Sequence, residues 1–120
     1  MGTVIHFEIN AEDPQRAAEF YSKALGWQIQ AWEGPLEYLL CATHAEGTPG
    51  IDGAIMRAEK RGQGTINTIE VAEIQSALKA INAAGGKQIS EVQPIPTIGL
   101  FCYCEDTEGN LFGILQPEMP

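Results

Sequence analysis

The order of apolar and polar residues predicts that the chain starts with a strand and then a helix. Residues 3–10 are rich in Val, Ile and Phe, which is typical of a strand. Asp13 and Pro14 follow as a helix-start signal, a capping side chain before a proline at the first helical position. Apolar residues then recur at helical spacing over residues 17–25, and Gly26 ends the pattern.

Three more strands are predicted before residue 57. Residues 27–33 and 37–43 flank a Gly34-Pro35 turn, which indicates a hairpin, and residues 50–57 form the next strand. The polar, glycine-bearing stretch 58–64 that follows is typical of a linker.

A similar order of elements returns after this linker. We predict a strand over residues 65–71, a helix with apolar positions over 74–81 that Gly85-Gly86 closes, and strands over 87–90, 99–105 and 111–116. The segment VQPIPT (92–97) is predicted to be a proline-bearing loop, and DTEGN (106–110) a turn.

The two halves are an internal repeat. A shift of 60 residues places Gly26 on Gly86 and Gly53 on Gly113. We therefore predict one α+β domain of two βαβββ modules, with module one at 1–57, the linker at 58–64 and module two at 65–120. Neither sheet can bury both faces alone, so the paired sheets are expected to enclose a central cleft. The modules could pair within one chain or by exchange between two chains.

Composition narrows the classes of partner. A formal net charge of −9 excludes the basic surface that nucleic acids and anionic lipids require. The chain has no apolar run of about 20 residues and no signal-peptide pattern at its start. Three cysteines are an odd number, which favours buried thiols in a reducing compartment over disulfides. We expect a cytoplasmic protein without nucleic-acid or membrane partners.

Three motifs carry a family resemblance: the opening HFEINAEDPQRAAEFYSKALGW, the second-half NTIEVAEIQSALKAINAAGG and the closing DTEGNLFGILQ. With the repeat, they make the chain resemble the vicinal oxygen chelate (VOC) superfamily over almost its whole length. That superfamily includes glyoxalase I, extradiol dioxygenases and bleomycin-resistance proteins. The resemblance implies paired, curled sheets around a cleft.

The resemblance also implies four metal-ligand positions, usually two histidines and two glutamates, on the first and last strands of the modules. His6 matches the first position. The repeat places the other three at Gly53, Ile66 and Gly113, or at Asn67 in place of Ile66 if the register slips by one. One imidazole does not hold a catalytic metal, and glycine offers no ligand atom. We therefore expect no metal and no other cofactor, and the family's metal-dependent activities do not carry over.

Strand alternation groups the remaining candidate residues. His6, Glu8 and Asn10 share one face of the first strand, and the apolar residues between them share the other. The polar face should line the cleft, where His6 and Glu8 could bind a common ligand or act as an acid–base pair. Aromatic walls could come from Trp27, Trp32, Tyr38, Phe101 and Tyr103. From these we select Trp32, Tyr38 and Tyr103 as ligand contacts, and VQPIPTIG as a flap over the cleft.

Three functions stay open. The leading hypothesis is metal-independent binding of a small molecule in the inter-sheet cleft. The alternative is a lyase or dioxygenase-type enzyme, which would use a divalent metal in an unorthodox site or His6 and Glu8 as acid and base. A third hypothesis is an interaction module with a vestigial cleft. In each case we expect a homodimer, because paired chains bury sheet edges.

Overall fold

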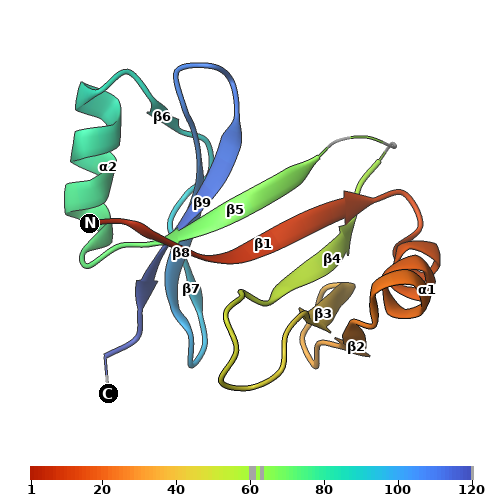
Figure 1. Ribbon diagram of the computed structural model, residues 1–120. Coiled ribbons are helices and arrows are strands. Elements are labelled where there is room, and N and C mark those ends of the chain that lie inside the picture. Colours follow the sequence, from red (N-terminus) through yellow and green to blue (C-terminus); the bar gives the residue numbers. More distant parts are fainter. Residues whose placement is uncertain (60–61, 63, 120) are drawn as a thin grey trace. The chain divides into compact units, whose positions relative to one another are not determined.

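The computed structural model describes residues 1–59, 62 and 64–119 (Figure 1). The chain divides into two compact units. One unit is His6–Ile66, and the other combines Met1–Ile5 with the chain from Asn67 onward. The predicted linker 58–64 falls partly on residues 60, 61 and 63, which lie outside the described residues. Residues 1–5, predicted to belong to module one, group with the second half of the chain.

The unit His6–Ile66 contains one helix and a mixed sheet. Its elements are β1 (Thr3–Ala11, of which residues 6–11 belong here), α1 (Pro14–Leu25), β2 (Gln28–Ala31), β3 (Tyr38–Ala42) and β4 (Gly53–Arg57). The sheet order is β2-β3-β4-β1, with β1 parallel to β4 and the other pairs antiparallel. The predicted strand–helix–hairpin–strand order is confirmed.

The helix α1 begins and ends at the predicted signals. The Asp13 side chain accepts a hydrogen bond from the backbone N–H of Arg16, and Pro14 is the first helical residue. Gly26 closes the helix with a φ of 77°, a conformation that glycine adopts without steric cost. The helix covers a core of Ala18, Leu39, Cys41 and Ile55, against which Ile9 and Trp27 pack.

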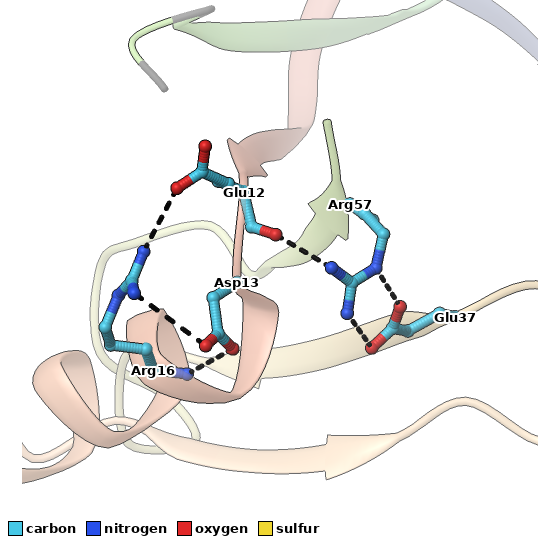
Figure 2. Close-up of polar contacts among 5 residues, drawn as sticks. All are labelled: Glu12, Asp13, Arg16, Glu37 and Arg57. Atoms are coloured by element: carbon cyan, nitrogen blue, oxygen red, sulfur yellow. Dashed lines mark hydrogen bonds and ion pairs between the residues drawn. The ribbon is translucent and has the colours of Figure 1, made fainter. Parts of the chain in front are cut away.

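A polar cluster ties the ends of three strands in this unit (Figure 2). The guanidinium of Arg57 donates to both carboxylate oxygens of Glu37, at 2.7 and 3.3 Å, and to the carbonyl of Glu12 at 2.8 Å. Arg16 forms ion pairs with Glu12 and Asp13 at 3.6 and 3.9 Å. Exposed pairs of this kind contribute little stability. The Arg57 guanidinium nevertheless links Glu37, the residue before Tyr38, to Glu12 directly after β1.

The other unit has the same plan with one additional strand. It contains β5 (Thr65–Glu70, here from residue 67), α2 (Ile74–Ala83), β6 (Lys87–Gln88), β7 (Gln93–Ile95), β8 (Gly99–Glu105) and β9 (Leu111–Pro117). β5 is parallel to β9, β9 is antiparallel to β8, and β8 pairs with both β6 and β7. The α2 core consists of Ile74, Leu78, Cys102, Cys104 and Ile114.

The prediction that VQPIPT forms a loop is wrong in part, because Gln93–Ile95 forms the strand β7. Proline is disfavoured within a sheet because it lacks an N–H donor, but it is tolerated in an edge strand, which pairs on one side only. Pro94 stands opposite Leu100 in such an edge pair with β8. A tight turn then leads into β8, closed by the Ile98 N–H donating to the Ile95 carbonyl at 2.9 Å.

The strand registers change the predicted alignment of the two halves at their last strands, β4 and β9. In the first unit, Gly53 pairs with Phe7 and precedes Ala54, which pairs with Glu8. Since Ile9 and Ile55 pack under α1, Gly53 faces the helix and Ala54 faces away from it.

In the second unit, Gly113 pairs with Thr68. Phe112 and Ile114 pack in the core under α2, so Gly113 faces away from that helix. The registers therefore align Gly113 with Ala54 instead of Gly53. They also align Thr68 with Glu8, and these are the two buried polar residues of the described chain.

No helix in the described part of the chain is long and apolar enough to cross a membrane.

Candidate functional site

The candidate site lies on the face of the first unit's sheet that points away from α1. His6 and Glu8 project from β1 on this face, because Ile9 and Phe7 occupy the helix side. Tyr38 begins β3, which is separated from β1 by β4. Between them stands Ala54, fully buried and opposite Glu8. Its small side chain leaves room for the Tyr38 phenol to reach across β4.

Tyr38 joins the two predicted polar residues through its hydroxyl. The hydroxyl donates to Oε2 of Glu8 at 2.6 Å, and it lies 2.8 Å from Nε2 of His6. Glu8 is 6% exposed, so its carboxylate is removed from bulk water and depends on such partners. The result is a continuous hydrogen-bonded chain from an imidazole through a phenol to a carboxylate. We call it the His6–Tyr38–Glu8 network.

Burial and nearby charges shift the pKa of His6 in opposite directions. Burial lowers the pKa of His6 below its ordinary value, and it outweighs the nearby carboxylates of Glu8 and Asp52. A hydrogen bond with the backbone of Asp52 also raises the pKa, but less. A lowered pKa keeps the imidazole neutral at pH 7. The site therefore combines a neutral imidazole with two nearby carboxylates, those of Glu8 and Asp52.

Trp32 adds an aromatic wall to the network. Its indole meets the Tyr38 ring at an interplanar angle of 69°, with the ring centroids 5.8 Å apart. The backbone N–H of Trp32 donates to the Tyr38 carbonyl at 2.8 Å, which closes the hairpin behind the two rings. Both side chains are half-buried. The sequence predicted Trp32 and Tyr38 as ligand contacts, and the fold brings them together.

Two other predicted ligand contacts, Asn10 and Tyr103, have contacts of their own. The Asn10 side chain donates to the carbonyl of Gly64 at 3.1 Å, so it ties the end of β1 to the chain before β5. Tyr103 belongs to the second unit, where its ring meets Phe101 edge-on at 4.8 Å. Its backbone N–H donates to the Ser90 hydroxyl at 2.8 Å.

Two surface hollows of this unit lie away from the network. One, of about 380 Å³, lies between the end of β1 and α1 and includes Arg16 and Phe20 in its wall. The other, of about 390 Å³, lies beside the loop after β3 and includes His44 and Glu46. Neither is lined by His6, Glu8 or Tyr38. We place the candidate site at the network because it has the hydrogen-bonded, partly desolvated groups that ligand chemistry requires.

The residues present do not fit the family's metal. In the described part of the chain, no group of three or more His, Cys, Asp or Glu side chains is arranged to hold a metal ion. Nε2 of His6 is engaged by Tyr38. The positions that the registers align on the last strands are Ala54 and Gly113, and neither side chain carries a ligand atom.

Comparison with known proteins assigns the family. The model of the Glyoxalase/Bleomycin resistance protein/Dioxygenase superfamily matches residues 3–114, so the chain belongs to this superfamily. A glyoxylase-like domain-containing protein from Didymella fabae is 32% identical over 121 residues, covering 94% of this chain and 92% of that protein.

Solved structures confirm the α+β fold. Methylmalonyl-CoA epimerase from Mycobacterium tuberculosis has a TM-score of 0.71 at 16% identity, covering 97% of this chain and 88% of that one. A superfamily member from Vibrio splendidus 12B01 has a TM-score of 0.65 at 17% identity, covering 95% and 97% of the two chains. At such identities the likeness concerns the fold alone.

Proposed function

We propose that this protein binds a small organic molecule, without a metal, at the His6–Tyr38–Glu8 network. The observation that carries the proposal is the hydrogen-bonded chain itself, with a carboxylate that is 6% exposed at one end. Burying a carboxylate is costly unless partners stabilise it. A group of this kind, beside two aromatic rings, offers a ligand both hydrogen-bonding atoms and apolar surface.

The donor set supports the absence of a metal from this function. A catalytic divalent ion needs about three protein ligands, and Ala54 and Gly113 supply none at the aligned positions. A structural relative is a methylmalonyl-CoA epimerase in complex with methylmalonyl-CoA and NH4+, at a TM-score of 0.72 and 13% identity. The same fold thus holds an organic ligand in that protein, and methylmalonyl-CoA belongs in a ligand screen of this one.

A thermal-shift screen tests the proposal. The panel contains nickel, zinc, manganese and iron(II), small aromatic and dicarbonyl compounds, and methylmalonyl-CoA. We expect at least one organic compound to raise the melting temperature of the wild type, and to lose this effect in His6→Ala and Glu8→Gln. Glu46→Gln, in the loop beside the second hollow, is the matched control. Strong stabilisation by any of the four metals, abolished in His6→Ala, would overturn the metal-free proposal.

A second candidate is acid–base catalysis by the same residues. It is favoured by the two short hydrogen bonds that connect His6 and Glu8 through one hydroxyl, since proton transfer needs contact at hydrogen-bond distance. This candidate predicts that a turnover found by activity profiling disappears in His6→Ala. Unchanged turnover in that variant would remove it.

We also propose that the protein is a homodimer in the cytoplasm, because pairing of two chains buries sheet edges and free cysteines are typical of a reducing compartment. Light scattering after size-exclusion chromatography would return twice the chain mass of 13.0 kDa. A single 13.0 kDa species at micromolar concentration would contradict the dimer.

A further inference from the structure

Gly34 fixes the position of the Trp32 indole. A Cβ atom added at residue 34 would overlap the six-membered ring of Trp32, so the indole lies directly against the backbone of the turn. Gly34 is not among the glycines with positive φ. A side chain at residue 34 would therefore displace the indole for lack of space and not through backbone strain.

The fixed indole and the Tyr38 ring form an aromatic corner beside the network. The two rings meet at 69°, while the His6 ring lies nearly parallel to Tyr38, at 17° with 6.3 Å between centroids. A planar molecule can stack on one ring of such a corner and meet the edge of the other. Its polar substituent would then be near the Tyr38 hydroxyl and the His6 imidazole.

Charge selects among planar molecules. The carboxylates of Glu8 and Asp52 both act electrostatically on His6. The whole chain carries a formal net charge of −9. A carboxylate or phosphate ligand would therefore be repelled both on approach and in place.

We infer that the site takes a neutral, planar aromatic molecule with a hydrogen-bonding substituent, held in the corner that the Trp32 and Tyr38 rings form. The inference rests on the proposed function and adds the class of ligand. Trp32 contacts the ligand directly. Gly34 is a positioning residue, because it lets the indole take the orientation on which the ligand ring stacks.

Three probes of matched size separate shape from charge. Benzamide is neutral and planar, benzoate is planar but anionic, and cyclohexanecarboxamide is neutral but not planar. We expect benzamide to bind at least about tenfold more tightly than either of the others, which corresponds to about 1.4 kcal/mol. Binding is measured from chemical-shift changes in ¹H–¹⁵N spectra at probe concentrations up to millimolar.

A double-mutant cycle tests the role of the turn. Gly34→Ala should weaken benzamide binding about tenfold, in line with the loss of one aromatic contact. Trp32→Leu should weaken it similarly, and Gly34→Ala should have no further effect in the Trp32→Leu background because the clashing ring is gone. Leu36→Ala, at a 68% exposed position in the same turn, is the control and should bind as the wild type does.

Several outcomes would overturn the inference. Equal or tighter binding of benzoate, equal binding of cyclohexanecarboxamide, no binding of benzamide at millimolar concentration, or additive effects in the cycle would each do so. Failure of this inference can be distinguished from failure of the proposed function. A non-planar or anionic compound that binds and depends on His6 would support the proposed function while refuting the aromatic class.

Discussion

At the scale of single residues, the Tyr38 hydroxyl connects the two polar side chains of β1, His6 and Glu8. Strand alternation alone places His6 and Glu8 on one face, so their proximity was predictable from the sequence. Their connection through a phenol was not. Tyr38 lies 30 residues from Glu8 in the chain, and the contact depends on the registers of β4 with both β1 and β3.

Tyr38→Phe should destabilise the protein while leaving the aromatic ring in place. The substitution removes a donor from the buried Glu8 carboxylate and a partner from His6. We expect a loss of about 1–3 kcal/mol in the free energy of unfolding, measured by urea denaturation at pH 7. Tyr21→Phe is the control, because the Tyr21 ring is held by stacking on Trp27 at 4.5 Å. A loss no larger than that of the control would contradict the network.

The cysteines should be inert while the protein is folded. Cys41, Cys102 and Cys104 are all free and buried. Burial raises the pKa of Cys41 to about 11 and, together with the neighbouring Cys102, that of Cys104 to about 12. Both thiols are therefore protonated at pH 8, and the thiolate is the reactive form. A thiol-reactive dye should label native protein slowly, and all 3 cysteines rapidly in guanidinium. Rapid labelling of the native protein would contradict this account.

At the scale of elements, local signals predicted most of the helices and strands. Asp13-Pro14 and Gly26 marked both ends of α1, because their effects act within one turn. The start of α2 was less visible in the sequence. Its cap is Glu73, whose carboxylate accepts from the backbone N–H groups of Gln75 and Ser76 at 2.9 and 3.0 Å. Glutamate is not among the residues that usually cap helices, so its sequence signal is weak.

The wrong element was β7, and the reason is tertiary. A segment with Pro94 and Pro96 is typical of a loop, but β8 provides an edge on which Gln93–Ile95 pairs. Tertiary pairing also explains why Gly113 aligns with Ala54, one residue away from the predicted Gly53. The matching glycines suggested one register in the repeat, and the pairings with β1 and β5 set another.

Thr97→Gly should stabilise the turn between β7 and β8. Thr97 has a φ of 67° and follows Pro96, a turn position that favours glycine. A β-branched residue there is strained by about 1–2 kcal/mol. After the entropy cost of glycine in the unfolded chain, we expect a net gain of about 0.5–1 kcal/mol in the free energy of unfolding. Thr97→Ala keeps a Cβ and should not give this gain. Equal effects of the two variants in urea denaturation would refute the strain.

At the scale of the whole molecule, the repeat and the motifs predicted the superfamily and the α+β fold, and both are confirmed. They could not predict the function, because the fold carries many functions and the site decides among them. At the aligned positions, Ala54 and Gly113 offer no metal ligand, whereas His6, Tyr38 and Glu8 form a network of their own. We therefore propose that this network binds an organic molecule and not a metal.

The most direct test follows the imidazole of His6 by ¹⁵N NMR while zinc or benzamide is added. The chain has 2 histidines, so His44→Gln leaves the His6 ring signals alone in the spectrum. We expect stoichiometric zinc to leave these signals in place, because Nε2 is engaged by Tyr38 and the described part of the chain has no group of three or more His, Cys, Asp or Glu side chains arranged to hold a metal ion. Benzamide should shift them saturably. A shift or broadening of the His6 signals by one equivalent of zinc, with no response to benzamide, would contradict the account.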